Sequence, residues 1–480
     1  MYVYQDKFLQ GLVLSILWYF FGVNFAKQYR FRQRQYFRLT FKASVPATLS
    51  MLVAALYNFA DRVVVGRVNP LGLSAIGVTM PFQVVQMAFV LLIGVGSATL
   101  ISIKYGKGDI DGASDVLFTG FVFIVISQLI ISILYMIFIE PIFSVLKIGS
   151  SLHDLSYKYI SIIVIGAVPT LTGYCLNNSV RALGYAKESM FYVSFSSILN
   201  IALDIFFVLV FGWGVRGAAI ATIISEFLVT IFVIGFFTSN KSSIKLHFSR
   251  EYLKSYFEEK KYFHTLLEII SAGTPSFFMQ LFGVVVTVLL NNSILQYGSD
   301  YHMAAVTIVN SVSMLFTMVI YGISQGMQPI IGYNFGSGDY KRVSYSYKLT
   351  LIFVLIVAGG GLGILLLFAE QIVSIFVKND KSLLSLTSGI LRVFLLGLPM
   401  IGAHSITTTF LQSTKKSFLA TLLNVLRYGG ILIPLLYIIP PIYGINGVYI
   451  SNALSDILAG LVALIIVFNV IKKEKYARKM

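Results

Sequence analysis

The sequence predicts an all-α polytopic membrane protein made of two six-helix bundles, related by a pseudo-twofold axis along the membrane normal. Three observations predict this fold class. Of the 480 residues, 57% are hydrophobic and only 12% are charged, with a mean hydropathy of +0.83. The apolar residues form long continuous runs, and these runs recur at matching positions in the two halves of the chain. Soluble proteins carry about 25% charged residues, so this composition excludes a soluble enzyme, a secreted domain and a disordered protein.

The length of each apolar run indicates a helix and not a barrel strand. A bilayer core about 30 Å thick requires about 20 apolar residues per helix, whereas barrel strands alternate over about 10 residues. The runs here are long and do not alternate. With approximate ends, they predict twelve transmembrane helices, at 43–66, 74–103, 115–139, 157–181, 188–212, 215–238, 265–291, 303–332, 343–369, 383–411, 418–439 and 445–471.

A weaker apolar run over residues 8–26 precedes the first predicted span. It does not have the form of a signal peptide, because Lys7 is its only early basic residue and a basic stretch follows it. A thirteenth span, an interfacial helix and a poorly defined start of the reading frame stay open. We expect an extra or interfacial helix, since no methionine lies between Met1 and Met51 to offer a simple later start.

Basic residues set the expected orientation. Lys and Arg total 36 against 20 Asp and Glu, a formal charge of +16. They concentrate in residues 27–42, in the 239–264 loop and in the C-terminal tail, all on one side of the predicted spans. Short cytoplasmic loops collect such residues, so we expect this side and the C-terminus to be cytoplasmic, in a protein of the plasma (inner) membrane. No basic stripe interleaves with aromatic residues on a polar domain, so no nucleic acid partner is expected.

An internal repeat relates the two halves at an offset of about 230 residues. The sequence GKGD at 106–109 recurs as GSGD at 336–339, and GVRG at 214–217 matches GING at 444–447. Six helices per half is an even number, so both halves have the same orientation, and a cavity between them suits alternating access. Four prolines at matching points are the expected hinges: Pro46, Pro169, Pro275 and Pro399.

The repeat and the polar stretch between its copies divide the chain. The alternating charges of that stretch are typical of a short amphipathic helix at the membrane surface. We expect an N-terminal apolar segment and basic linker at 1–36, an N-terminal bundle at 37–238, a cytoplasmic linker at 239–264, a C-terminal bundle at 265–471 and a basic tail at 472–480.

Acidic residues inside the spans are the candidate functional groups, because an ionisable side chain in the bilayer carries a high free-energy cost. Asp61 lies in the first span and Asp204 in the fifth. Asn200 precedes Asp204 by four residues, so both side chains project from one helix face. Asn177 and Thr222, in spans four and six, add oxygen ligands. A hard cation such as sodium prefers such a set, and a drier site would make the carboxylate a proton carrier.

Two further acids, Glu226 and Asp456, lie about halfway along spans six and twelve. For any single acid in the membrane, a helix–helix hydrogen bond is the structural alternative. The second half has no acid at the positions equivalent to Asp61 and Asp204. The cation-coupling site is therefore expected in the first half alone.

Other polar residues are weaker candidates. Gln280 in span seven and Gln325 and Gln328 in span eight either line the substrate cavity or hold helices together. His404 in span ten is expected to be a packing residue. Cys175 is the single cysteine, which excludes an intrachain disulfide and a cysteine-based zinc site. No P-loop, HExxH or nucleophile elbow occurs, so neither an enzyme nor a cofactor is expected, and the only ion is a coupling proton or sodium.

Five segments of the sequence form a further pattern: YNFADRVVVG at 57–66, RALG at 181–184, LNIALD at 199–204, GAAIAT at 217–222 and GISQGMQPIIGYN at 322–334. Together they resemble the multidrug and toxic compound extrusion family. The resemblance covers about residues 37–471, and it implies an antiporter, driven by protons or sodium, that exports amphipathic, often cationic drugs through a V-shaped pair of six-helix bundles. The family normally has twelve helices, so the 8–26 run departs from it.

The bacterial branch that this sequence resembles has its cation site in the N-terminal bundle. Another branch uses acids in spans seven and ten, where this sequence has Gln280 and no carboxylate after Lys381. The resemblance implies small organic cations or drugs and the lipid bilayer as partners, and we expect a monomer. The cation site, with sodium as one candidate ion, carries over to Asp61, Asn177, Asn200, Asp204 and Thr222.

Two alternative functions stay open. A lipid-linked oligosaccharide flippase of related architecture would favour a cavity rich in Arg and Lys for pyrophosphate. Few basic residues fall inside the spans here, and Arg392 and Arg427 are the clearest. A non-transporting receptor or scaffold would not need intramembrane acids in one half.

Overall fold

The computed structural model describes residues 34–68, 70–145, 148–247, 249, 252, 256, 261–377 and 380–476. Every regular element in these ranges is a helix, which confirms the all-α prediction. The predicted 8–26 helix lies outside the described residues.

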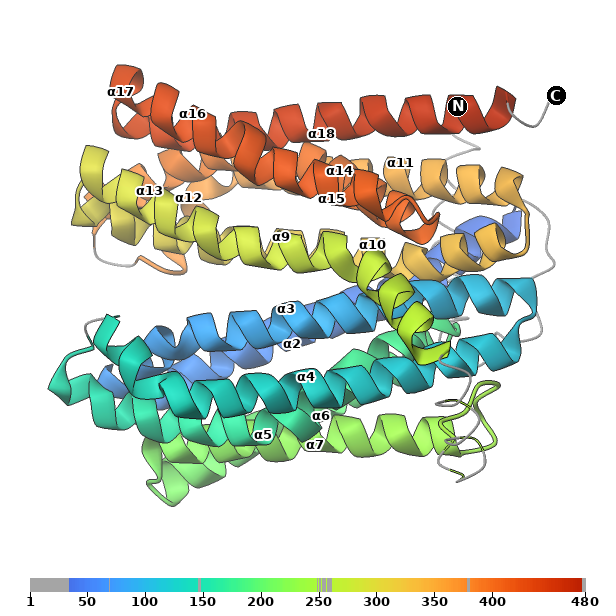
Figure 1. Cartoon of the computed structure of the whole chain (residues 1–480). Helices are drawn as coiled ribbons and strands as arrows, with labels where there is room; N and C mark the ends of the chain where they lie inside the picture. Colours follow the sequence, from blue (N-terminus) through green and yellow to red (C-terminus); the bar gives the residue numbers. More distant parts are fainter. Residues whose placement is uncertain are drawn as a thin grey trace.

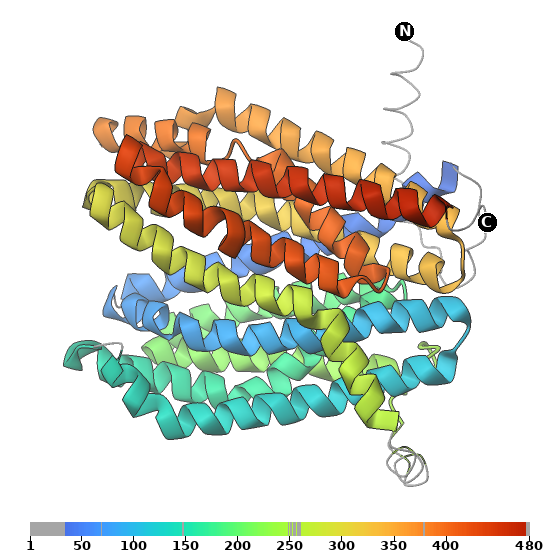
Figure 2. The same cartoon turned by 45° about the horizontal axis from the view of Figure 1, so that its top comes forward.

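The first half of the chain forms one bundle, drawn from blue to green in Figures 1 and 2. Its six long helices coincide with the first six predicted spans, and the fifth continues into a π-helix, η2. The elements are α2 (Arg34–Val68), α3 (Pro70–Lys107), α4 (Ile110–Val145), α5 (Ser150–Ala182), α6 (Ala186–Asp204), η2 (Ile205–Val210) and α7 (Gly214–Thr238).

The second half forms the other bundle, drawn from yellow to red (Figure 1). Its eleventh predicted span is built from α15, a π-helix η3 and α16 in succession. The elements are α9 (Lys261–Tyr297), α10 (Asp300–Gly336), α11 (Tyr340–Leu367), α12 (Ala369–Ser374), α13 (Lys381–Phe394), α14 (Leu398–Ser413), α15 (Ser417–Val425), η3 (Leu426–Leu432), α16 (Ile433–Ile438), α17 (Pro440–Tyr443) and α18 (Ile445–Tyr476).

The helices of the described residues suit a membrane by length and composition. Ten helical stretches are long and apolar enough to cross one, and the α13–α14 pair adds an eleventh if it forms one span. The apolar stretch of α2, Phe41–Tyr57, is shorter. Large apolar side chains remain exposed, including Ile165 at 67%, Leu367 at 75% and Phe468 at 70%. Extensive exposed apolar surface of this kind is typical of membrane contact.

The tenth predicted span, 383–411, is not one continuous helix. It breaks into α13 and α14, which are inclined at 43°, and Pro399 lies in the first turn of α14. A Cβ on the preceding Gly397 would lie 2.5 Å from the Asp456 side chain, so glycine at the break lets the backbone approach α18. Pro169, the counterpart of Pro399 in the repeat, lies inside the continuous helix α5.

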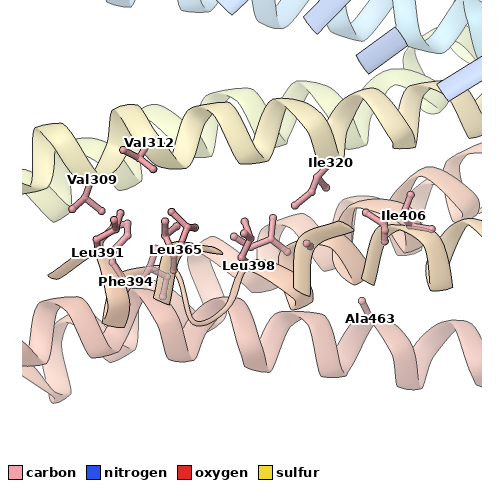
Figure 3. Close-up of a cluster of buried hydrophobic side chains, with 14 of the residues drawn as sticks. Val309, Val312, Ile320, Leu365, Leu391, Phe394, Leu398, Ile406 and Ala463 are labelled. Carbon is pink, nitrogen blue, oxygen red and sulfur yellow. The ribbon is translucent and has the colours of Figure 1, made fainter. Parts of the chain in front are cut away.

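An apolar core stabilises the second bundle. Val309 and Ile320 of α10 lie opposite Leu391 of α13 and Leu398 of α14, with Ala463 on α18 (Figure 3). All five side chains are essentially inaccessible to solvent. Because lipid tails are as apolar as these side chains, close van der Waals contact within the bundle is what favours its assembly.

The two halves meet mainly through their first two helices: α2 packs against α10, and α3 packs against both α9 and α10. Glycine permits the closest approaches. A Cβ on Gly106 would lie 2.1 Å from the carbonyl oxygen of Tyr333, and one on Gly336 would lie 2.0 Å from that of Ile103. The two contacts are equivalent in the repeat, so the pseudo-twofold relation appears in the interface itself.

These glycine contacts lie at one end of the molecule, where α3 ends at Lys107 and α10 ends at Gly336. We call this the basic end, because Lys107 and Arg342 lie there. Gln328 of α10 adds a hydrogen bond to the Thr99 hydroxyl of α3 at 2.7 Å. The halves are therefore in direct contact at the basic end.

Gly336→Leu tests this contact. Overpacking a closed site costs about 1–3 kcal/mol, so we expect the halves to separate more often at the basic end. In a Cys175→Ser background, a Ser102→Cys side chain, fully buried in the structure, should react with a soluble maleimide about tenfold faster or more. Gly359→Leu is the control, because a Cβ at Gly359 has open space around it. Equal rates in the two variants would contradict the assignment.

Candidate functional site

Three acidic side chains of the first half converge inside its bundle: Asp61 from α2, Asp204 from α6 and Glu226 from α7. All three lie close enough to Tyr159 of α5 to interact electrostatically with its hydroxyl group. Tyr159 is itself buried. The fold therefore brings together acids from three helices in the interior of the first bundle.

Asp204 is fully buried, with 0% of its surface exposed. It is the last residue of α6 before the π-helix η2, and π-helical turns occur frequently at functional sites. Its Oδ1 atom accepts no hydrogen bond from the described residues. The carboxylate of Asp61 is near enough to interact with that of Asp204. An incompletely bonded carboxylate in a dry interior has a high free energy, which a bound proton or metal cation would lower.

Asn200 links Asp204 to the neighbouring helix α7. With its amide NH2 group toward the carboxylate, Asn200 donates a hydrogen bond to Oδ2 of Asp204 at 3.1 Å and accepts one from the backbone N–H of Thr222 at 3.3 Å. In the opposite orientation, the amide nitrogen lies 3.4 Å from Oγ1 of Thr222. In both orientations, Asn200 connects the acid on α6 to Thr222 on α7.

Asn177, the fifth residue expected at this site, is buried on α5. Its Oδ1 atom has no hydrogen-bond donor among the described residues. Within the same part of the chain, no hydrogen bond joins Asn177 to Asp204 or Asn200. Its place in the coupling group therefore stays a prediction from the resemblance.

A cavity of about 330 Å³ lies beside the acidic group. Among the described lining residues, Gln280 of α9 is the one from the second half. Among the described residues of the wall, Glu226 is the single acid, and none is a lysine or arginine. The lining residues are Ala54, Tyr57, Met80, Gln83, Val84, Gln86, Met87, Ile163, Ala167, Thr170, Leu171, Tyr174, Thr222, Ile223, Glu226 and Gln280.

The three glutamines that the sequence offered for a substrate cavity occupy different places. Gln280 lines the cavity. Gln328 is directed to α3, where it binds the Thr99 hydroxyl. Gln325 lies on α10 and is not among the residues that line this cavity.

The four prolines expected as hinges also differ in their settings. Pro46, Pro169 and Pro275 lie inside the helices α2, α5 and α9. Pro399 lies at the break between α13 and α14. Proline inside a helix removes a backbone hydrogen bond and favours a kink, so the hinge role of these residues stays a prediction.

The second half contains an ion pair at the place equivalent to Glu226. Asp456 of α18 accepts hydrogen bonds from Nε of Arg427 at 3.1 Å and from Nη2 at 2.8 Å, and both side chains are only about a tenth exposed. The guanidinium group also lies 5.0 Å from the centre of the Tyr428 ring. His404 has the packing environment that the sequence predicted, with Nε2 3.3 Å from the carbonyl oxygen of Leu423.

The described residues contain no group of three or more His, Cys, Asp or Glu side chains that could hold a metal ion. A metal cation in the first bundle would therefore use mixed oxygen ligands. The buried oxygens of Asp204 and Asn177 that lack donors fit such a role.

The sequence places Glu226 inside a span but provides no reason to assign it to the site. Its aromatic neighbours Tyr57 and Tyr174 are two of 28 tyrosines, and no local pattern distinguishes the two that face a cavity. The pairing of Arg427 with Asp456 was also missed. The available signal was the arginine itself, since a basic residue inside a span needs a partner.

Both halves of the chain match one protein-family model. The family model described as MatE matches residues 46–206 and 275–438, one segment in each half. The chain is similar to the multidrug export protein MepA of Staphylococcus saprophyticus, at 26% identity over 447 residues, which cover 92% of this chain and 95% of that protein. MepA of Staphylococcus aureus is 25% identical over 443 residues, with the same shares covered.

Solved structures share the two-bundle fold. A MATE protein crystallised in a bent conformation superposes with a TM-score of 0.82 at 23% identity, covering 92% of this chain and 97% of that one. An outward-facing multidrug resistance MATE family transporter of the MOP superfamily gives a TM-score of 0.84 at 22% identity, covering 93% and 99%. These similarities confirm the prediction of two six-helix bundles.

Asp456→Asn tests the ion pair of the second half. The substitution leaves Arg427 buried without its counter-charge, which destabilises a protein by about 3–5 kcal/mol. We expect a clearly lower thermal unfolding midpoint in detergent. Glu226→Gln is the matched comparison, because no lysine or arginine lines its cavity, and it should lower the midpoint much less. Equal decreases of the unfolding midpoint in the two variants would contradict a stabilising role for the Arg427–Asp456 ion pair.

Proposed function

Because the chain belongs to the MatE family of multidrug and toxic compound extrusion transporters, we propose that it is a secondary active antiporter. It exports amphipathic, often cationic drugs in exchange for protons or sodium ions, by alternating access between its two bundles. The similar MepA proteins carry the description multidrug export protein, which supports the drug cargo. The observation that carries the proposal is the buried Asp204 group beside a cavity in the first bundle.

In this mechanism, Asp61 and Asp204 alternate between cation-bound and cation-free states. A bound proton or sodium ion relieves the repulsion between the two carboxylates, and its release restores that repulsion. Asn200 and Thr222, with Asn177, complete the oxygen ligands. The resulting shift of helices around Pro46 in α2 and Pro169 in α5 changes the cavity's affinity for drug. By linkage, drug and cation each lower the other's affinity.

We also propose the placement and division of the chain expected from the sequence. The basic end faces the cytoplasm, and the protein is a monomer of the plasma membrane. The bundles comprise residues 37–238 and 265–471, joined by the linker 239–264. The linker contacts the first bundle, since the Tyr252 hydroxyl donates a hydrogen bond to Asp115 of α4 at 2.7 Å.

The cavity does not favour the flippase alternative. A pyrophosphate group is usually recognised by arginine and lysine, and neither residue lines the cavity among the described residues. The buried Arg427 of the second half is already paired with Asp456.

Asp204→Asn tests the coupling role. The substitution keeps the size of the side chain and removes the charge, so we expect gradient-driven ethidium transport in everted membrane vesicles to fall about tenfold or more. Glu140→Gln is the control, because that side chain is 60% exposed at the end of α4. Unchanged transport in Asp204→Asn would remove Asp204 from the mechanism.

The coupling ion is identified by imposing a pH gradient and a sodium gradient in turn on the same vesicles. One of the two gradients should drive ethidium transport in the unmodified protein. If neither gradient does so, the chain is not an antiporter of this kind.

Cysteine labelling tests the orientation. In a Cys175→Ser background, Ser337→Cys lies at the basic end after α10, and Ser299→Cys lies at the opposite end before it; both positions are exposed. A membrane-impermeant maleimide should label Ser299→Cys in intact cells and Ser337→Cys only after permeabilisation. The reverse pattern would invert the proposed topology.

A further inference from the structure

Only one of the three converging acids reaches the cavity. Glu226 forms part of its wall, together with Thr222 one helical turn earlier on α7. Asp204 is fully buried and is not a lining residue, and Asp61 is not one either. Of these three acids, Glu226 is therefore the one placed to contact a molecule in the cavity.

The wall around Glu226 is aromatic and hydroxylic. The hydroxyl-bearing side chains of Tyr57, Thr170 and Tyr174 line the same cavity as Glu226. Hydroxyl groups can donate hydrogen bonds to a carboxylate without cancelling its charge. The wall therefore combines one carboxyl group with two aromatic rings.

This chemistry suits an organic cation. A positive group is attracted both to a carboxylate and to the faces of aromatic rings, more strongly where water is excluded. Met80 and Met87 supply flexible, polarisable side chains in the same wall, which adapt to ligands of different shape.

The acid equivalent to Glu226 in the second half has a basic partner. Its counterpart in the repeat, Asp456, is bound by two nitrogen atoms of Arg427. The second acid is therefore neutralised by its own chain and has no charge to offer a ligand. Glu226 has no lysine or arginine beside it in the described cavity wall, so a cationic ligand can supply the missing counter-charge.

We propose that Glu226, with Tyr57 and Tyr174, forms a recognition site for organic cations that is separate from the Asp204 coupling site. The proposal deepens the antiporter function above and rests on it for its place in the transport cycle. Thr222 joins the two sites, because it lines the cavity and lies beside Asn200. One turn of α7 therefore carries both the residue that touches the ion site and the residue that binds the cargo.

Equilibrium binding of tetraphenylphosphonium to the purified full-length protein in detergent tests this site. We expect Glu226→Gln to weaken binding about tenfold or more, whereas Glu226→Asp, which keeps the charge, should retain most of it. Binding of triphenylphosphine oxide, a neutral compound with similar aromatic groups, should change less than about twofold in both variants. Glu140→Gln should leave both affinities unchanged.

Two results would overturn the proposal. One is tetraphenylphosphonium binding by Glu226→Gln as tight as that of the unmodified protein. The other is an equal loss of affinity for the neutral compound, which would indicate a change of shape and not of charge. The thermal unfolding midpoint of each variant, together with the Glu226→Asp result, separates a lost charge from a failure to fold.

Asp204→Asn distinguishes this inference from the proposed function. The variant should lose gradient-driven transport but still bind tetraphenylphosphonium in the absence of a gradient, with an affinity changed only by the linkage between the two sites. If the unmodified protein binds the cation through Glu226 but no gradient drives transport, the antiporter proposal fails and the recognition site stands. If transport is driven normally in Glu226→Gln, the recognition site fails and the antiporter stands.

Discussion

Direct contact of backbone with backbone between the two halves is the constraint on which the rest of the structure depends. Gly106 and Gly336 approach the carbonyl groups of Tyr333 and Ile103 so closely that no Cβ would fit. Because lipid tails are as apolar as the helices, the hydrophobic effect does not drive the helices together within the membrane. Close van der Waals contact of this kind instead favours the pairing of the bundles. The first two helices of each half supply most of the interface, and α2 and α3 also line the cavity of the first bundle together with α5 and α7.

The symmetry of the fold makes the asymmetry of its charges informative. Glu226 and Asp456 occupy equivalent positions, yet Arg427 neutralises the second, whereas no lysine or arginine lines the described wall of the cavity beside the first. An ionised group inside a bundle must be paired, hydrogen-bonded or placed beside a polar cavity. The second half pairs its acid with an arginine, which suits a structural element. The first half places its acid beside a cavity, which suits binding.

The first bundle holds two carboxylates in unlike surroundings. Asp204 lies in a dry interior at the start of a π-helix, with Asn200 as its neighbour, whereas Glu226 faces a cavity lined by tyrosine and methionine. The first setting suits a small ion, and the second has room for an organic molecule. Thr222 lines the cavity and lies beside Asn200, so one helix borders both sites.

The sequence by itself determined the fold class, the helices, the repeat and the expectation that the working acids lie in the first half. These features follow from local hydropathy and from spacing along the chain, which need no tertiary contact. Only the tertiary structure decided that Glu226 lines a cavity, that Asp456 binds Arg427 and that Gln328 bonds to Thr99 of the first half while Gln280 lines the cavity. The physical reason is that the rotation of a helix about its axis and the identity of its neighbours depend on side chains far away in the sequence. The same reason explains the break before Pro399, where glycine at 397 admits a close approach to α18.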